Sequence, residues 1–373
     1  MNQIALKELC SLTMGQSPSS DTYNDEQVGY PFYQGNADFG KLHPCARMWC
    51  DKPKKMAKKD DILISVRAPI GSLNIATEDC CIGRGLAAIT VNSSKSDMLY
   101  LFYALSAYNT ILQNKGTGST FKAINKNALE ELLIPDYSKE KQVEIGQVLQ
   151  KVDQLIDTRN KQLSKLDELV KSRFIEMFGD LSCNKKKYPI KRLKDIAIWW
   201  NGLTYKPSDI VDASKGVLVL RSSNIQDSEL AFYDNVYVGC SIKEKYLVQN
   251  NDILMCSRNG SAALVGKCAL IKDIKKPMAF GAFMMNIRSS YYPYLKVYFQ
   301  TSDFRRQIAT GTTTINQITG KMLENVKVIV PGIDEVSKFA DFLRGIDKSK
   351  MTIQKSLDEL ETLKKSLMQQ YFG

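Results

Sequence analysis

Two stretches of the chain carry apolar residues at alternating steps of three and four. They are residues 139–178 and 335–371. This spacing, sustained over about five heptads, is typical of a coiled-coil seam and not of a helix that faces a globular core. The seam positions are Ile145, Leu149, Val152, Ile156, Leu163, Leu166, Val170 and Met177, and then Val336, Phe339, Leu343, Ile346, Ile353, Leu357, Leu360, Leu367 and Tyr371. Basic residues interrupt the stripe at Arg159, Arg173, Lys350 and Lys364.

A lone helix of this kind would leave its apolar stripe in water, so each long helix needs a partner. The first helix must also deliver the chain to the segment that follows it. If the second helix packs back antiparallel, the pair forms a rod about 60 Å long, from roughly 40 residues at a rise of 1.5 Å. The alternative is that each helix pairs with another molecule and the protein is a dimer. We favour the intramolecular antiparallel pair.

The remaining segments, residues 1–135 and 188–331, consist of short apolar and β-branched runs separated by Gly, Asn, Asp and Pro. Such runs are typical of strands and turns in a mostly β domain. Each segment also contains one predicted helix near its end, at about residues 96–114 and 292–309. The predicted strands lie in the runs DILISV, LAAITV, GVLVL, DILMCS, KCALI and KVIV.

The two halves of the chain repeat one another at offsets of 191 to 196 residues. The repeated pieces are Asp61–Leu63 with Asp252–Leu254, Gly116–Thr120 with Gly311–Thr314, Pro135 with Pro331, Leu166–Leu169 with Leu357–Leu360, and Phe178-Gly179 with Phe372-Gly373. A repeat of this length is a domain and not a solenoid unit.

The sequence therefore predicts an α+β fold. Two mostly β domains are each followed by a long α-helix, and the two helices form an antiparallel coiled coil with pseudo-two-fold symmetry. The predicted boundaries are 1–137 and 188–332 for the two domains, and 138–180 and 333–373 for the two long helices.

The repeated Gly- and Thr-rich loop is the most suggestive local chemistry. Small hydroxyl residues, lysines and close-approaching glycines are suited to gripping phosphates. An ordinary exposed turn would look similar in one copy, but its return at the matched place favours a binding role. The candidates are Lys115, Thr117, Ser119, Thr120 and Lys122 in the first copy, and Thr312, Thr313, Thr314 and Asn316 in the second.

Two further places pair between the copies and carry polar side chains. The stretch Tyr33–Asn36 aligns with Arg221–Asn224 at an offset of 188, and an arginine follows each Asp-Ile-Leu strand. Arg, Asn and Gln are the side chains that read base edges in DNA. Our candidates for contacts to bases or nearby are Gln34, Asn36, Arg67, Arg221, Asn224 and Arg258, and Arg84 and Asn259 complete the predicted interface.

Composition narrows the class of protein. The 373 residues are 44% hydrophobic and 24% charged, which suits a folded protein of two domains. The net charge of +11 favours a polyanionic partner. No apolar run approaches the roughly 20 residues of a membrane span, and the N-terminal residues lack a signal pattern, so we expect a cytoplasmic protein.

The number and spacing of the cysteines and the histidine predict neither a metal centre nor a set of disulfides. The chain has nine cysteines and one histidine. An odd cysteine count argues against a disulfide scaffold. Cys45 and Cys50 could begin a zinc site, but no second pair at metal spacing follows them. We therefore expect no metal ligands, and the cysteines are interpreted as small buried thiols.

Enzyme signatures are missing. The chain has no G-x-x-x-x-G-K-[ST] phosphate loop and no N-P-P-Y or D-P-P-Y sequence for methyl transfer to a base. Residues 83–88 match a loose G-x-G-x-x-A pattern but run into a predicted strand, not a helix. With one histidine, His-based acid–base chemistry is nearly excluded. The sequence predicts a protein that recognises a ligand, with no catalytic residue.

Taken in order and twice, the repeated pieces resemble the DNA specificity subunits of type I restriction–modification systems, over the whole chain. The resemblance implies two target-recognition domains, each reading one half of a split double-stranded DNA target, with the helices fixing the spacer. It implies two modification (methyltransferase) subunits as partners, which supply S-adenosylmethionine chemistry and methylate an adenine in each half. Restriction (translocase) subunits would add ATP- and Mg-dependent cleavage, so this chain itself would hold no cofactor.

Two rival interpretations remain. One is a two-headed coiled-coil scaffold that binds partner proteins without reading DNA. The other is a single-chain restriction–methylation enzyme, which would need catalytic motifs that the sequence lacks.

Overall fold

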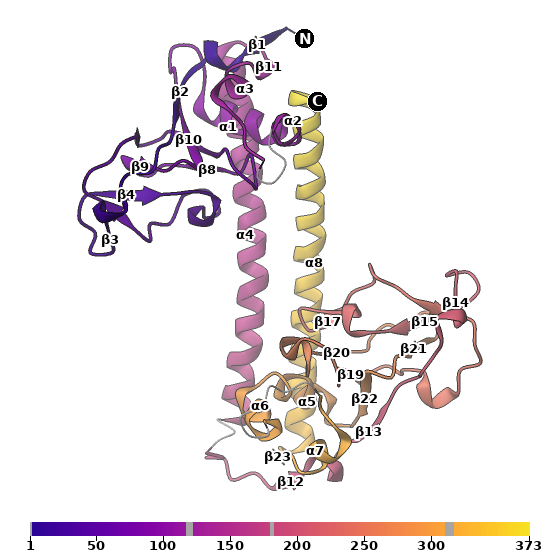
Figure 1. The fold of residues 1–373 in the computed structure, drawn as a ribbon. Coiled ribbons are helices and arrows are strands. Elements are labelled where there is room, and N and C mark those ends of the chain that lie inside the picture. Colours follow the sequence, from indigo (N-terminus) through magenta and orange to yellow (C-terminus); the bar gives the residue numbers. More distant parts are fainter. Residues whose placement is uncertain (1, 117–121, 180–182, 310–316) are drawn as a thin grey trace. The chain divides into compact units, whose positions relative to one another are not determined.

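The computed structural model describes residues 2–116, 122–179, 183–309 and 317–373 (Figure 1). The chain divides into two compact units, the first made of residues 1–161 and 353–373 and the second of residues 162–352. Two helices of 40 residues each, α4 (Lys139–Phe178) and α8 (Ile333–Phe372), contribute to both units. Among the described residues, no helix combines the length and apolarity needed to cross a membrane.

The sheet-rich domain of the first unit has three sheets. A four-stranded sheet has the order β2-β10-β7-β8, a five-stranded sheet has the order β3-β5-β4-β9-β6, and β1 pairs with β11. The strands are β1 (Gln3–Ala5), β2 (Cys10–Met14), β3 (Tyr23–Asn24), β4 (Tyr30–Tyr33), β5 (Trp49–Cys50), β6 (Met56–Ala57), β7 (Ile62–Ser65), β8 (Leu73–Ile75), β9 (Cys80–Ile82), β10 (Leu86–Val91) and β11 (Leu133–Pro135). The short helices are α1 (Met98–Ala107), α2 (Asn109–Lys115) and α3 (Lys126–Glu130).

The domain of the second unit repeats this plan. Its sheets have the orders β13-β22-β19-β20 and β14-β18-β15-β21, and two further pairs are β12-β23 and β16-β17. The strands are β12 (Ile190–Arg192), β13 (Ile198–Asn201), β14 (Ile210–Val211), β15 (Val217–Leu220), β16 (Ile225–Gln226), β17 (Glu229–Leu230), β18 (Tyr237–Val238), β19 (Ile253–Cys256), β20 (Cys268–Leu270), β21 (Met278–Phe280), β22 (Met284–Arg288) and β23 (Lys327–Ile329). The short helices are α5 (Tyr292–Tyr298), α6 (Ser302–Ile308) and α7 (Gly320–Glu324).

The repeated Asp-Ile-Leu sequence has a structural cause. The isoleucine and leucine open the buried central strands β7 and β19. The aspartate closes the turn before each strand, because its carboxylate accepts a backbone hydrogen bond from three residues upstream. The distances are 2.8 Å from Lys58 N to Asp61 Oδ2 and 2.8 Å from Gln249 N to Asp252 Oδ2.

Within each unit the two long helices run antiparallel. In the first unit, Lys364 Nζ lies 2.6 Å from Asp153 Oδ1, and Arg159 Nε donates to Ser356 Oγ at 3.2 Å. A lower number on α4 thus meets a higher number on α8, which is antiparallel order. The predicted fold class, two sheet-rich domains with paired long helices, is confirmed.

In the second unit, α4 meets α8 in the same order. Lys350 forms an ion pair with Asp167, and the Phe174 and Phe339 rings lie 5.8 Å apart. The basic residues that interrupt the apolar stripe therefore pair with polar or acidic side chains of the facing helix at three of four places. The fourth, Arg173, lies over the Phe342 ring at 5.9 Å.

The repeated Phe-Gly sequence at the end of each long helix completes a core. Phe372 packs 5.5 Å from Tyr100 in the first unit, and Tyr108 Oη donates to the Phe372 carbonyl at 2.8 Å. Phe178 lies 5.0 Å from Tyr294 in the second unit. Each long helix thus follows one sheet-rich domain in sequence and ends in the core of the other.

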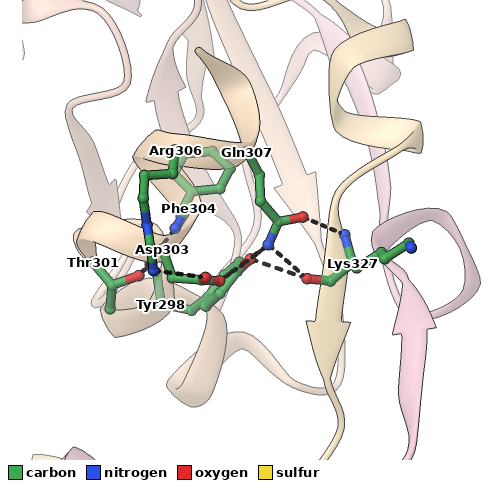
Figure 2. Close-up of polar contacts among 7 residues, drawn as sticks. All are labelled: Tyr298, Thr301, Asp303, Phe304, Arg306, Gln307 and Lys327. Carbon is green, nitrogen blue, oxygen red and sulfur yellow. Dashed lines mark hydrogen bonds and ion pairs between the residues drawn. The ribbon is translucent and has the colours of Figure 1, made fainter. Parts of the chain in front are cut away.

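The helix expected in each domain is divided in two. In the second unit, Thr301 ends the run begun by α5 and caps α6 by accepting from Phe304 N at 3.3 Å. Figure 2 shows how α6 is then fixed: the Gln307 amide donates to Lys327 O at 2.9 Å and accepts from Lys327 N at 2.8 Å. Gln307 thereby joins α6 to strand β23, just ahead of residues 310–316.

Candidate nucleic-acid interface

In the first unit, three strands end at one place. Strands β4 and β9 are parallel neighbours with Tyr33 opposite Ile82, and Gly83 N donates to Tyr33 O at 2.8 Å. The turns that follow β4, β9 and β7 therefore meet at the same edge. They enclose a hollow of about 210 Å³, called the first pocket here, lined by Ser17, Gln34, Gly35, Asn36, Ser65, Arg67, Ala68, Arg84 and Gly85.

Four predicted residues that lie up to 50 positions apart in sequence thus come together: Gln34, Asn36, Arg67 and Arg84. Both arginines and Gln34 are exposed, and Asn36 is half-buried. Ser17 Oγ accepts from the Arg84 backbone N at 3.3 Å, which fixes the start of that turn.

The Arg67 turn is tied to the end of the repeated loop. Ser65 Oγ donates to Arg67 O at 2.8 Å, Arg67 forms a β-bridge with Ala123, and Ile124 N donates to Val66 O at 3.0 Å. Lys122 precedes the bridge and is exposed. The chain therefore comes back from the Gly- and Thr-rich loop beside Arg67.

The turn after β4 is held by an aspartate that the sequence analysis did not single out. Asp38 Oδ2 accepts from Gln34 N at 2.7 Å and from Gly35 N at 3.3 Å, and its other oxygen pairs with Arg47 at 2.6 Å. This arrangement leaves the Gln34 side chain exposed. Gly85 is required across the pocket, because a Cβ there would lie 2.3 Å from Gln34 O.

The second unit has the matching site, a hollow of about 530 Å³ called the second pocket here. It is lined by Ser222, Arg258, Asn259, Gly260 and Phe283. The Arg258 turn repeats the Arg67 turn closely. Cys256 Sγ donates to Arg258 O at 3.6 Å, Arg258 forms a β-bridge with Gln317, and Ile318 N donates to Ser257 O at 2.7 Å.

Phe283 is a functional candidate that the sequence analysis missed. The residue is 61% exposed, and the Arg258 guanidinium lies 5.5 Å from the centroid of its ring. Asn259 Nδ2 donates to Ser222 Oγ at 3.1 Å on the other side of the pocket. The missed signal was the turn Gly281-Ala282-Phe283, which takes the place of Gly83-Arg84-Gly85 after the matching strand.

The structure corrects the prediction for Asn224. Its side chain is fully buried, its Oδ1 accepts from Arg221 N at 2.9 Å, and its Nδ2 donates to Ala231 O at 2.9 Å. Asn224 therefore holds a turn and does not face a ligand. The alignment of the two copies is also corrected. Arg221 corresponds to Gln34, because each is the first residue after a strand that has a parallel neighbour. Asn224 corresponds to Asp38, because each accepts a hydrogen bond from the backbone N of that first residue.

Arg221 is half-buried and already engaged. Its Nη2 lies 2.8 Å from Asp234 Oδ2 and donates to the Asp234 carbonyl at 3.3 Å. The neighbouring residue, Ser222, lines the second pocket, whereas Arg221 does not.

The remaining candidates belong to the repeated loops. Lys115 ends helix α2 and is exposed, so it and Lys122 flank the first loop. Thr117, Ser119, Thr120, Thr312, Thr313, Thr314 and Asn316 lie outside the described residues.

The chemistry of the two pockets suits binding. Guanidinium groups carry fixed donors in a fork that matches acceptor pairs on bases and phosphates. Burial raises the pKa of Tyr33 to about 12, so the phenol beside the first pocket stays neutral. Among the described residues, no three His, Cys, Asp or Glu side chains are grouped to hold a metal ion.

Comparisons with known proteins identify the family of the chain. A family model described as "Type I restriction modification DNA specificity domain" matches residues 1–168 and 185–362. A putative type I restriction enzyme MjaX specificity subunit from Methanocaldococcus jannaschii is 43% identical over 160 residues, which are 43% of this chain and 38% of that protein. That match therefore spans well under half of the relative.

Two longer matches are more distant. The type I restriction enzyme MjaVIII specificity subunit of Methanocaldococcus jannaschii is 22% identical over 293 residues, covering 73% of this chain and 68% of that protein. The crystal structure of a type-I restriction-modification system S subunit from M. genitalium superposes with a TM-score of 0.62 at 16% identity. It covers 100% of this chain and 96% of that one, which shows a shared fold.

Proposed function

The chain belongs to the family of type I restriction–modification DNA specificity domains, and on that premise we propose that it reads a split double-stranded DNA target, one half with each unit. Members of this family are specificity subunits, and the chain is a non-catalytic one. The proposal concerns what the two units bind and which residues do so.

One observation carries the proposal: the same arginine turn occurs in both units, each time at the edge where parallel strands end. Arg67 and Arg258 are both exposed, both bridge to the residues that follow a Gly- and Thr-rich loop, and both line a pocket. A duplicated surface of this kind suits a ligand with two similar but separate sites. Duplex DNA offers such sites, and the net charge of +11 favours it as a polyanion.

The two pockets differ in the groups around the shared arginine, which supports different sequences in the two half-sites. The first pocket adds Arg84 and Gln34, and the second adds Asn259 and Phe283. Bidentate arginine favours guanine, bidentate Asn or Gln favours adenine, and an apolar ring contacts the thymine methyl group. Each good bidentate contact contributes about 1–3 kcal/mol of discrimination.

The proposal extends to partners. The paired helices would set the spacing of the two half-sites, and two modification subunits would dock on the chain and supply S-adenosylmethionine chemistry. In a restriction system, further subunits would supply ATP- and Mg-dependent translocation and cleavage. The support for this part is family membership and the shared fold.

The matched arginines define the test. Selection of binding sites from a random duplex library by the full chain with its modification subunits would give a two-part consensus for the wild type. Arg258→Ala should relax one half of that consensus, and Arg67→Ala should relax the other. Arg344→Ala is the control, because that exposed arginine of α8 pairs with Asp341 and lines neither pocket.

Two outcomes contradict the proposal. Weakening of both halves alike by Arg258→Ala shows that this arginine reads no base. Failure of the wild-type complex to retain any duplex favours the rival interpretation, a scaffold that binds proteins alone.

A further inference from the structure

A turn rich in lysine lies beside the first pocket and was not part of the predicted interface. The lysine turn, defined here as residues 52–55, follows the exposed Asp51 in the connection from β5 to β6 and contains Lys52, Lys54 and Lys55. All three lysines are exposed. Within the described part of the first unit, the ion pairs engage none of them.

The sheet register places this turn at the edge that carries the pocket. Strand β6 is antiparallel to β9 with Met56 opposite Cys81, and Ile82 N donates to Lys55 O at 3.0 Å. Arg84 follows Ile82 by two residues and lines the first pocket. Strand β9 ends next to the start of β6. The Arg84 turn, which follows β9, and the lysine turn, which precedes β6, therefore lie side by side.

Charge and position together suggest the ligand. Flexible lysines interact with phosphate as point charges, whereas the planar fork of arginine suits base edges and bidentate contacts. Lys58 and Lys59 also follow β6, but the Lys59 backbone is held by Asp79 and the Lys58 backbone by Asp61, so acidic groups lie near them. The connection from β5 to β6 has three lysines and one aspartate, Asp51, so it carries a net charge of +2 beside the pocket arginines.

We propose that the lysine turn binds the phosphate backbone of the duplex next to the half-site that the first pocket reads. This inference rests on the proposed function and adds a contact that is independent of base sequence. The matched turn of the second unit keeps Lys243 and Lys245 but has Glu244 and Tyr246 in place of Pro53 and Lys55, so it carries less positive charge.

Salt dependence of binding tests the inference, because each neutralised phosphate contributes about 0.9 to the slope of log affinity against log salt. We expect Lys54→Ala with Lys55→Ala to lower the slope of the full chain by about 1.8. At 0.1 M salt, a slope of 0.9 corresponds to about an eightfold loss of affinity per lysine, if the contribution vanishes near 1 M. The loss should be equal for target and scrambled duplexes of one length.

Two further variants make the result specific. Lys54→Arg with Lys55→Arg keeps both charges and should keep the wild-type slope, which separates charge from fold. Lys151→Ala with Lys355→Ala removes the same charge from exposed positions on α4 and α8 and should leave the slope unchanged. Methylphosphonates beside the first half-site should weaken the wild type and leave the Lys54→Ala, Lys55→Ala variant unaffected.

The failures are distinguishable. If the wild type binds no duplex, the proposed function is wrong. If the wild type binds and the alanine pair leaves the slope unchanged, the lysine turn does not contact phosphate and the proposed function stands. If the alanine pair instead prevents assembly with the modification subunits, the turn binds an acidic protein surface and the inference is overturned.

Discussion

The Asp252–Arg288 pair, at the end of strands β19 and β22 opposite the second pocket, gives the most quantitative prediction. The Asp252 side chain is 1% exposed and accepts from Arg288 Nε at 2.7 Å and Nη2 at 2.8 Å, which raises the pKa of Arg288. It also accepts from Gln249 N at 2.8 Å and from Asn286 Nδ2 at 2.7 Å. Arg288→Ala would leave a buried carboxylate with two neutral donors and no opposite charge.

Breaking a buried ion pair by removing one partner costs about 3–5 kcal/mol. The Arg288 side chain is 35% exposed, and the two neutral donors remain, so we expect the lower end, about 3 kcal/mol. For a unit of this size, a loss of about 3 kcal/mol lowers the midpoint of thermal unfolding by about 6–12 °C. The matched control is Arg306→Ala. The Arg306 side chain is 65% exposed, so its pair with Asp303 should contribute about 1 kcal/mol or less.

Hydrogen exchange resolves the effect by unit. Amides of β19 and β22 should lose protection in Arg288→Ala, while those of β7 and β10 in the first unit should keep theirs. In an Asp252→Asn background the buried charge is gone, so adding Arg288→Ala should cost much less than it does in the wild type. An equal cost in both backgrounds, or an equal loss of protection in both units, would refute the reasoning.

Three further predictions concern the second unit. Phe283→Ala removes an exposed cation–π contact of about 0.5–1 kcal/mol, so affinity for the second half-site should fall about two- to fivefold in a titration, and an unchanged affinity would exclude a role for the ring. Asn224→Ala should lower the free energy of unfolding in urea by about 1–3 kcal/mol, because it leaves buried backbone groups unpaired; an effect on target choice without loss of stability would contradict its structural role. Burial acts to raise the pKa of Glu229, but Lys296 and Lys272 outweigh it and the pKa is lowered. Its stabilising contribution is therefore complete above the ordinary value of 4.5 and is lost as pH falls through the lowered pKa, so the stability difference between wild type and Glu229→Gln should shrink only in acid.

The long helices could be predicted from sequence because their signal is local and repetitive. The first helix was expected over residues 139–178 and spans Lys139–Phe178. The shorter helices were harder, since their apolar faces continue across the breaks. Thr301 divides the helix of the second unit, because its side chain caps the start of α6. The spacing of apolar residues does not reveal such a cap.

Among the predicted residues that line the two pockets, the repeat pointed most directly to the two arginines. Arg67 and Arg258 follow the same strand at a fixed offset, so comparing the copies was sufficient. Asn224 was misplaced because short polar stretches align equally well one residue apart, and burial decides between them. Phe283 was missed because its counterpart is Gly85, and a side chain that is present in one copy alone leaves no repeated signal.

The packing of Phe372 against Tyr100 has a consequence for synthesis of the chain. Tyr108 and Phe372 are bonded across 264 residues of sequence. At about 5–20 residues per second, a ribosome needs about 13–50 s to translate that interval. During this interval the nascent first unit lacks Phe372, so Tyr100 and Tyr108 are without their partner until α8 has been synthesised. Chaperones and proteases can reach these residues in that time. A message truncated before the second helix would therefore yield a first unit whose core lacks Phe372.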